Sequence, residues 1–298
     1  MRISLSIMYI ILGKNGYIAE AIIKELTSRN LHHISFSRSD FDYTDFEKFS
    51  NYAHIHYNDL INPFKNATII NCAGYIGKPN VDACESSKAD TIVGNVVFPS
   101  NLAAFCSQNY ATLVHISSGC IYNGYSKHFT EEDPSNFDFQ NGSFYSGTKA
   151  LAEQLILKQD PNSYIFRLRI PFDEFKSPRN YITKILNYNK LLNAENSFSH
   201  RADFAKYTID LLESKAPKGI YNVTNKGSMT TEEAIEMIKD HKITNKNFEF
   251  FDDLETFTSE VVAPRSNCVL DTSKIENQIK IRTVQEAFSD ALSKYPKN

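Results

Sequence analysis

The chain has 298 residues, which is enough for one α/β unit and a smaller lobe. Its formal net charge of −3, with 22% charged residues, gives no reason to expect nucleic acid or an anionic membrane as a partner. The five cysteines are scattered without a CxxC pair, and the eight histidines show no metal-ligand spacing, which argues against a disulfide framework and against a metal site.

The first predicted strand is MYIILG, residues 8–13. The segment before it begins at Met1 and lacks a small-residue cleavage site, so we interpret the whole N-terminus as a buried strand and not as a signal peptide. No apolar stretch approaches the roughly 18 residues that a membrane-spanning helix needs. We therefore expect a soluble, cytoplasmic protein with reduced thiols.

Short apolar runs alternate with amphipathic segments of helical length. The runs predict strands at residues 8–13, 32–37, 67–74, 112–118 and 163–169. Apolar residues at helical spacing predict helices at 17–29, 95–108 and 145–158, the second of them despite Pro99. This alternation predicts an α/β fold with a Rossmann-type, doubly wound parallel sheet, which residues 1–169 form as a first domain.

The pattern changes after about residue 170, where proline and asparagine become frequent and the apolar runs become shorter. Thr230 and Glu233 have the spacing of a capping box, which predicts the start of a helix. We expect residues 170–298 to form mainly a substrate-binding lobe at the carboxyl ends of the strands, where ligands bind in such folds.

The first strand runs into a glycine turn. Gly13 permits the tight turn, and Gly16 lets a pyrophosphate approach the helix N-terminus, where free N–H groups and the helix dipole favour anions. Ala19 stands where a third glycine is common, and its methyl group should still allow close packing. Because the turn follows a strand and opens a helix, it favours a dinucleotide site over an ordinary turn. The predicted contacts are Gly13, Lys14, Asn15, Gly16, Tyr17 and Ile18.

The second strand ends in Ser37 and Arg38, without an acidic residue there to hold the 2′-hydroxyl of NAD. An arginine suits a 2′-phosphate, so this pattern favours NADPH, and Lys14 in the glycine turn favours it further. The alternative interpretation of Arg38 is an ordinary solvated surface residue.

Three residues form a candidate reductase centre. Ser118 ends the strand at 112–118, while Tyr145 and Lys149 lie four apart at the start of the next helix and therefore on one face. Lys149 and the oxidised nicotinamide would lower the pKa of Tyr145, so that its phenol exchanges a proton with a substrate oxygen held by Ser118. A YxxxK pair occurs by chance in many proteins, and its position after the serine is what favours this function.

The glycine turn, NCAG at 71–74, Asn95, Ser118 and the Tyr145/Lys149 pair together resemble an extended short-chain dehydrogenase/reductase. The resemblance covers nearly the whole chain. It implies that the serine, tyrosine and lysine are catalytic and that the C-terminal lobe binds a nucleotide-sugar. It also implies further cofactor contacts, from Ser37, Arg38, Asp42, Tyr43, Ala73, Gly74, Tyr145 and Lys149.

Within that family, DYTD at 42–45 and APRSNCVLDTSKI at 263–275 resemble dTDP-4-dehydrorhamnose reductases. The segments GKPNVDACES, SGCIY, GSFYSGTKA, SPRNYITKI and APRSN are closer to the 3,5-epimerase/4-reductase of UDP-L-rhamnose synthesis. This chain resembles the free-standing enzyme of a giant DNA virus, which would imply that the protein is located in the host cytoplasm. Plant enzymes are expected to have threonine at Ser118, which also offers a hydroxyl. The implied substrate contacts are Val81, Ser118, Arg179, Asn180 and Arg265.

Cys120 is the candidate for the epimerase chemistry, and the alternative interpretation is a small core residue. A ketone at C4 acidifies the hydrogens at C3 and C5, and inversion needs a base on one face and an acid on the other. A thiol beside the hydroxyl that holds the ketone oxygen suits one role, and related GDP-sugar epimerase/reductases also have this cysteine. By resemblance Lys184, otherwise a plausible solvated lysine, is the second group. Gly119 and Cys120 replace the acidic pair of 4,6-dehydratases.

The sequence therefore predicts an NADPH-dependent enzyme that epimerises UDP-4-keto-6-deoxy-D-glucose at C3 and C5 and reduces C4 to give UDP-L-rhamnose. An inert Cys120 would indicate instead a dTDP-4-dehydrorhamnose 4-reductase without epimerase activity. A non-catalytic NADP(H)-binding regulatory protein is the third alternative, which the complete serine, tyrosine and lysine set disfavours. The choice between UDP and dTDP, and between base and acid, stays open here. We expect a homodimer through the Tyr145/Lys149 helix, without nucleic acid, membrane or metal.

Overall fold

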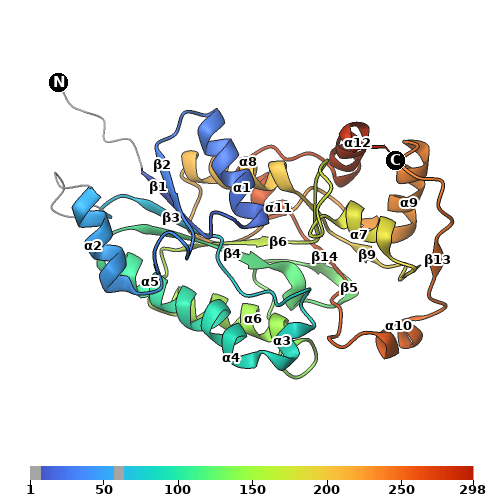
Figure 1. Cartoon of the computed structure of the whole chain (residues 1–298), viewed down its shortest axis with the longest axis horizontal. Helices are drawn as coiled ribbons and strands as arrows, with labels where there is room; N and C mark the ends of the chain where they lie inside the picture. The colour runs from blue at the N-terminus through green and yellow to red at the C-terminus, as the bar shows by residue number, and fades with distance from the viewer. Residues whose placement is uncertain (1–7, 57–63, 298) are drawn as a thin grey trace.

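Six parallel strands form the central sheet of the protein, whose computed structural model describes residues 8–56 and 64–297 (Figure 1). Their order is β11-β6-β4-β3-β1-β2, and every pairing between neighbours is parallel. The strands are β1 (Tyr9–Leu12), β2 (His33–Phe36), β3 (Thr68–Asn71), β4 (Thr112–Ser118), β6 (Tyr164–Leu168) and β11 (Gly219–Asn222). The predicted fold class is confirmed, and the first five strands lie within the ranges that the sequence predicts.

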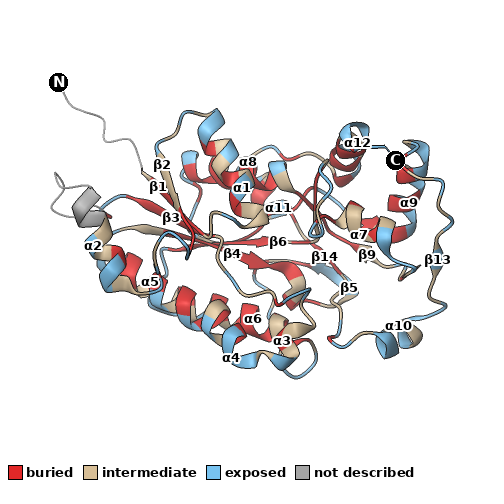
Figure 2. Ribbon diagram, in the orientation of Figure 1, coloured by how far each residue is buried: buried red, intermediate tan, exposed pale blue. Residues whose placement is uncertain are grey.

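Helices cover both faces of this sheet, and its strands are therefore largely buried (Figure 2). Alternate residues of β1 enter two separate apolar clusters, Tyr9 and Ile11 on one face and Ile10 and Leu12 on the other. One cluster includes α1 (Tyr17–Ser28) and α8 (Arg201–Glu213). The other includes α2 (Phe46–His56), α5 (Phe98–Gln108) and α6 (Phe144–Gln159).

The predicted helix at 95–108 begins inside a π-helix, η1 (Val93–Val97), and continues as α5. Pro99 follows closely after η1, so the π-helix shifts the helical hydrogen-bond pattern next to the residue that has no backbone N–H to donate. The short helices α3 (Ala83–Ser86) and α4 (Lys88–Ile92) precede η1. The 3-10 helix η2 (Gly119–Ile121) and the strand β5 (Gly124–Phe129) follow β4.

The region after residue 169 builds a third apolar cluster, in which α7, α9 and α12 pack together. Its elements are β7 (Pro171–Phe172), α7 (Tyr181–Asn187), β8 (Lys190–Leu191), β9 (Glu195–Asn196), β10 (Ser199–His200), β12 (Met229–Thr230), α9 (Thr231–Asp240), β13 (Glu249–Phe250), α10 (Leu254–Glu260), β14 (Cys268–Leu270), α11 (Ser273–Glu276) and α12 (Val284–Lys294). The predicted capping box of Thr230 and Glu233 is present at the start of α9.

Two elements of this C-terminal region belong to the sheet layers. β11 pairs with β6 at the edge of the sheet, and α8 packs on α1. The sequence analysis did not predict β11, whose four residues GIYN carry a weak strand pattern. The predicted division at residue 169 therefore leaves one strand and one covering helix of the sheet in the C-terminal part.

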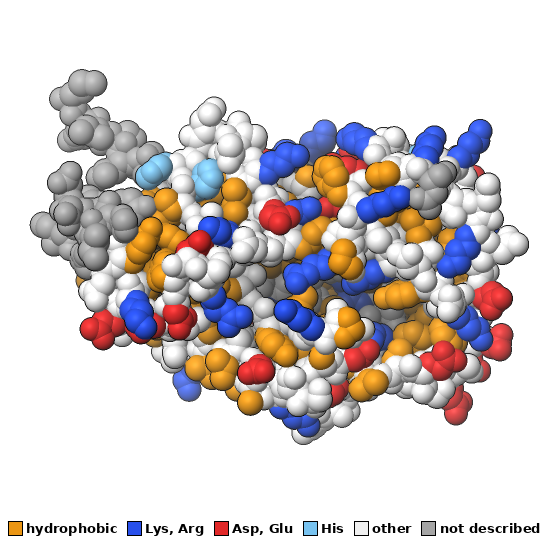
Figure 3. Space-filling view, in the orientation of Figure 1, with side chains coloured by type: hydrophobic (Ala, Val, Ile, Leu, Met, Phe, Trp, Pro, Cys, Tyr) orange, Lys and Arg blue, Asp and Glu red, His pale blue; other side chains and the backbone are white. Residues whose placement is uncertain are grey.

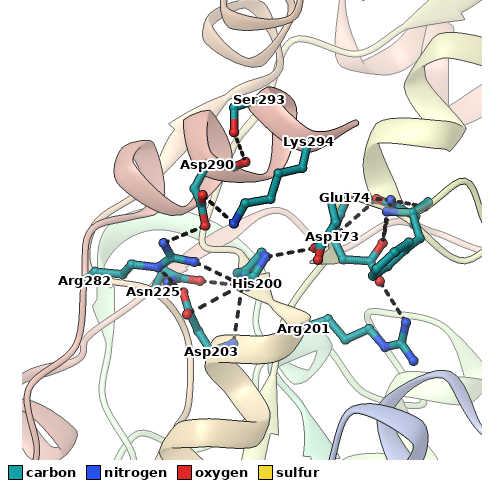
Figure 4. A network of polar contacts seen from close by, with 12 residues as sticks. Asp173, Glu174, His200, Arg201, Asp203, Asn225, Arg282, Asp290, Ser293 and Lys294 are labelled. Atoms are coloured by element: carbon teal, nitrogen blue, oxygen red, sulfur yellow. Dashed lines mark hydrogen bonds and ion pairs between the residues drawn. The ribbon is translucent and has the colours of Figure 1, made fainter. Parts of the chain in front are cut away.

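A polar network around His200 and Arg201 joins several elements of the C-terminal region (Figure 4). Arg201 at the start of α8 donates hydrogen bonds to the Tyr17 backbone carbonyl and to the Asp173 carboxylate, and its guanidinium lies 4.3 Å from the centre of the Tyr17 ring. Burial alone would lower the pKa of the neighbouring His200, but hydrogen bonding to carboxylates, Asp203 foremost, raises it. Through Arg201 the network also holds the start of α8 against Tyr17 at the start of α1.

Residues 1–7, which we interpret from the sequence as the beginning of the first strand, lie outside the described residues. Among the described helices, none combines the length and the apolar character that crossing a membrane requires. The same residues contain no group of three or more His, Cys, Asp or Glu side chains placed to hold a metal ion.

Candidate active site

The glycine turn has the geometry that a bound pyrophosphate needs. Gly13 has a φ of +86°, and a Cβ there would lie 2.9 Å from the Ala73 backbone nitrogen, so only glycine fits between β1 and the loop after β3. Gly16 is the N-cap of α1 and supplies no capping side chain. The first N–H groups of α1, from Tyr17 and Ile18 onward, are therefore available to an anion. Asn15 lies within the turn between them.

The end of β2 differs from the sequence prediction in one respect. Asp40 accepts hydrogen bonds from the Ser37 backbone and hydroxyl at 2.7 and 2.9 Å, and it pairs with Lys14 at 2.8 Å. These contacts, led by the one to Lys14, lower the pKa of Asp40 to about 2. Lys14 is thus already paired, while Arg38 is exposed beside Tyr43. Ser37 and Asp40 are three residues apart, which is a spacing typical of a capping contact. The sequence analysis could have predicted the contact from it.

The loop after β3 is fixed beside the glycine turn by two asparagines. Asn95 accepts a hydrogen bond from the Tyr75 backbone nitrogen at 2.7 Å and donates one to its carbonyl at 2.8 Å. A Cβ on Gly74 would lie 3.2 Å from the Asn95 side-chain oxygen, so the glycine lets this contact form. The Ala73 backbone nitrogen donates to Asn71 at 3.0 Å. The predicted cofactor contacts Ala73 and Gly74 therefore lie next to Gly13, whereas Asp42 is exposed and caps Thr44.

The structure brings Ser118, Tyr145 and Lys149 together where β4 meets α6. Ser118 caps η2 by accepting a hydrogen bond from the Cys120 backbone nitrogen at 3.1 Å, and its hydroxyl also interacts with the Tyr145 phenol. Lys149 is buried and donates to the Ile116 carbonyl at 3.0 Å. A hydroxyl, a phenol and an amine thus converge at the carboxyl end of a central strand, which suits proton transfer to a carbonyl oxygen.

Burial dominates the electrostatics of this centre. It raises the pKa of Tyr145, while the hydrogen bond with Ser118 opposes the rise. It lowers the pKa of Lys149 to about 8, against the attraction of Glu153. The sequence analysis predicts a phenol acidified by Lys149 and the oxidised nicotinamide. In the structure the phenol is held protonated at neutral pH, which suits a proton donor.

The sequence analysis did not identify His115, which lies beneath Lys149. The Asn71 side-chain oxygen accepts a hydrogen bond from the Ala73 backbone nitrogen. The amide nitrogen of Asn71 is therefore the group that donates to His115 Nδ1, at 3.1 Å. A neutral imidazole must then carry its proton on Nε2, which faces the Lys149 amine at 3.2 Å. Burial, and next the charge of Lys149, lowers the pKa of His115 well below its ordinary value. Its only sequence signal is a histidine on an otherwise apolar strand.

Lys149 should make the stability of the protein depend on pH. Above about pH 8 folded Lys149 has released its proton, whereas the unfolded side chain keeps it to about pH 10.4. The free energy of unfolding of the wild type relative to Lys149→Met should therefore rise between these values, by about 3 kcal/mol in total. Denaturant titrations from pH 7 to 10 measure it, with Lys158→Met on the exposed side of α6 as the control. A constant difference for Lys149→Met would contradict the burial argument.

Cys120 and Lys184 reach the same site from the two parts of the chain. Cys120 is partly exposed on η2 and lies close enough to Tyr145, Lys149 and Lys184 to couple electrostatically with each of them. Burial lowers the pKa of Lys184, and the nearby cation Arg179 lowers it further. Lys and Arg side chains surround a hollow near the centre of the face in Figure 3. The candidate acid and base of the epimerase prediction are therefore close to the candidate reductase centre.

Of the predicted substrate contacts, Arg265 is paired with a carboxylate, Arg179 is exposed and Asn180 is buried. Arg265 forms a two-pronged ion pair with Asp82, next to Val81, at 2.7 and 3.0 Å. Arg179 is exposed beside Lys184. Asn180 is fully buried and uses its side chain to cap α7 and to bond the segment from Asp173 to Phe175. The amide of Asn180 is thus engaged in holding this loop in place.

Comparisons with known proteins agree with this geometry. The family model described as the RmlD substrate binding domain matches residues 7–296. Over 238 residues the chain is 38% identical to the trifunctional UDP-glucose 4,6-dehydratase/UDP-4-keto-6-deoxy-D-glucose 3,5-epimerase/UDP-4-keto-L-rhamnose-reductase of Arabidopsis thaliana, covering 76% of this chain but only 34% of that protein. It is 37% identical to the bifunctional dTDP-4-dehydrorhamnose 3,5-epimerase/dTDP-4-dehydrorhamnose reductase of the same plant, covering 76% of this chain and 77% of that protein.

Solved structures share the fold over nearly the whole chain. The L780 UDP-rhamnose synthase from Acanthamoeba polyphaga mimivirus has a TM-score of 0.85 at 24% identity, covering 96% of this chain and 99% of that one. The dTDP-4-dehydrorhamnose reductase from Bacillus anthracis, in complex with NADP, has a TM-score of 0.78 at 19% identity, covering 98% and 99%. At these identities the likeness establishes the common architecture.

Proposed function

Because the chain belongs to the RmlD substrate binding domain family, we propose that it is an oxidoreductase that uses NADP(H) to reduce the C4 ketone of a nucleotide-linked 4-keto-6-deoxy sugar. The observation that carries the proposal is the convergence of Ser118, Tyr145 and Lys149 at the carboxyl end of β4. The names of the plant relatives and the NADP complex of the Bacillus anthracis reductase support the substrate class and the cofactor.

The residues present fit the dinucleotide. The glycine turn and the uncapped start of α1 would hold the pyrophosphate, and exposed Arg38 would face the 2′-phosphate. When bound, NADPH supplies the hydride for C4. Tyr145 donates the proton to the C4 oxygen, Ser118 orients that oxygen by a hydrogen bond, and buried Lys149 lies behind Tyr145 on the same face of α6.

We propose further that the enzyme first epimerises C3 and C5 and then reduces C4, so that UDP-4-keto-6-deoxy-D-glucose becomes UDP-L-rhamnose. The support is the position of Cys120 beside Ser118 and of Lys184 on the opposing part of the chain. Ser118 and Tyr145 stabilise the enolate oxygen while protons move at C3 and C5. A hydroxyl pair that binds the ketone oxygen can thus serve both half-reactions.

The experiment that tests the function is incubation with NADPH and the 4-keto sugar, followed by identification of the product by NMR. UDP- and dTDP-4-keto-6-deoxyglucose are supplied separately, each with and without a 3,5-epimerase. UDP-L-rhamnose formed without added epimerase supports the bifunctional enzyme. A product that requires the added epimerase indicates a 4-reductase alone, and cofactor binding without turnover of either sugar indicates a regulatory protein. The homodimer through α6 stays a prediction.

Arg38→Ala should reduce the preference for NADPH over NADH by about 10-fold or more, because a charge-assisted hydrogen bond to the 2′-phosphate is worth about 1.5–3 kcal/mol. Lys14→Ala is the matched control, since Asp40 already pairs with this cation and its loss should change the preference less. Ratios of kcat/KM for the two cofactors measure the effect. Equal use of both cofactors by the wild type would contradict the assignment of Arg38.

A further inference from the structure

Arg169 is a buried cation beside the candidate epimerase thiol. Only 1% of the residue is exposed, and its Nη1 donates to Cys120 Sγ at 3.5 Å and to Ser266 Oγ at 3.0 Å. Its Nη2 donates to the Ser266 carbonyl at 2.8 Å and to the Asn196 side-chain oxygen. The Nε group is buried without a hydrogen-bond partner. Within residues 8–56 and 64–297, no carboxylate is paired with this guanidinium.

Arg167, two residues earlier on β6, shows what a buried arginine ordinarily requires. It is 3% exposed, and Glu153 neutralises it through three hydrogen bonds of 2.6 to 3.1 Å. A buried charge without a counter-charge is costly, so such charges are normally paired. Among the groups that Arg169 contacts directly, the Cys120 thiol is the one that can become an anion.

The Arg169 side chain passes close to η2, the helix that carries Cys120. A Cβ on Gly119 would lie only 2.6 Å from the Leu270 side chain, so glycine lets β14 approach η2, and the Arg169 side chain lies at contact distance, 3.5 Å from the same point. The other titratable groups that act on Cys120 come from three elements, namely Tyr145 and Lys149 on α6, Lys184 on α7 and Cys268 on β14. Two of these four are cations and none is a carboxylate.

We propose that Arg169 is the counter-cation of Cys120 and holds it as a thiolate, which makes Cys120 the base of the epimerisation and Lys184 the acid. This inference rests on the proposed epimerase function. A guanidinium donor beside sulfur stabilises the thiolate over the thiol, since thiolates form next to cations. Arg169 is a positioning residue in this scheme, because it acts on the substrate through Cys120.

One inversion neither gains nor loses protons overall. The Cys120 thiolate removes the hydrogen as a proton from the carbon beside the ketone, which leaves a thiol and an enolate. The Lys184 ammonium gives a proton to the opposite face of the same carbon, which leaves a neutral amine and the inverted centre. Solvent then returns the thiol to thiolate and the amine to ammonium, with no net consumption. Burial lowers the pKa of Lys184 and so makes its ammonium a readier donor.

Alkylation of Cys120 by iodoacetamide, followed by mass spectrometry of its peptide from pH 5 to 9, tests the proposal. In the wild type the rate constant should already be near its plateau at pH 7. In Arg169→Met it should fall by about 10- to 30-fold at pH 7, because an ordinary thiol with a pKa of about 8.5 is only a few per cent ionised there. Arg169→Lys should restore part of the rate. Cys72, whose pKa burial raises to about 12, is the internal reference and should stay unreactive.

Two controls separate the possible failures. Ser266→Ala removes a neutral partner of Arg169 and should leave the alkylation profile unchanged. A wild-type rate that rises only near pH 8.5 overturns the proposal, even if every Arg169 variant fails to fold. If the wild type shows no solvent deuterium uptake at C3 or C5, the epimerase function itself is wrong, and if Cys120→Ser keeps that uptake, Cys120 is not the base. If that variant loses uptake while Arg169→Met keeps both the wild-type alkylation profile and the uptake, only the role of Arg169 is wrong.

Discussion

Replacing Tyr145 by phenylalanine should lower the rate of C4 reduction by about 100-fold or more, the ordinary contribution of a positioned general acid. In the proposed mechanism the phenol donates the proton to the C4 oxygen, and burial raises its pKa further above neutrality, so that it carries that proton. Phenylalanine fills nearly the same volume on α6. Single-turnover oxidation of NADPH with a pre-epimerised 4-keto-L-rhamnose nucleotide isolates this step from the epimerisation.

Tyr122→Phe is the matched control for that variant. Tyr122 is fully buried close to the site, and its hydroxyl donates to the Asp133 carbonyl at 2.7 Å. Its loss should cost about 1 kcal/mol of stability and leave the reduction near the wild-type rate. NADPH titration by fluorescence verifies that Tyr145→Phe still binds the cofactor. Near-normal turnover by a Tyr145→Phe protein with intact binding would show that another residue is the acid.

Cys120→Ser should separate the two half-reactions. A serine hydroxyl hardly ionises near neutral pH, so the variant should lose deuterium uptake from solvent at C3, at C5 or at both, by about 100-fold or more. Ser118, Tyr145 and Lys149 remain in place. The variant should therefore still reduce a pre-epimerised 4-keto-L-rhamnose nucleotide. NMR of deuterium uptake beside NADPH oxidation measures both activities in one sample.

Lys184→Ala should produce the same separation, because inversion needs a proton-transfer group on each face of the ring. If both activities of Cys120→Ser fall in equal proportion together with stability, the cysteine is a core residue. If uptake in Cys120→Ser is unchanged, Cys120 is not a proton-transfer group, whereas a wild type without any uptake would be a 4-reductase that depends on a separate epimerase. If deuterium uptake is lost in Cys120→Ser but kept in Lys184→Ala, the thiol keeps its proposed role and a residue other than Lys184 is the acid.

The sequence by itself determined the fold class, the dinucleotide turn and the reductase centre. These features are local in the chain: an apolar strand such as β1 is buried on both faces, Gly13 and Gly16 are needed within one turn, and Tyr145 and Lys149 share a helix face four residues apart. A period of 3.6 residues fixes which helical side chains lie together before any tertiary contact forms. The capping box of Thr230 and Glu233 was predictable for the same reason.

Only the tertiary structure decided which charges meet. Lys14 pairs with Asp40 across 26 residues, His115 lies under Lys149 across 34, and Arg169 reaches Cys120 across 49. Asn180, a plausible substrate contact from its motif, is turned inward as the cap of α7. Electrostatic and hydrogen-bond energies depend on distance through space and on burial, neither of which is encoded by spacing along the chain. The residue types of the site can therefore be predicted from the sequence, whereas their protonation states depend on the fold.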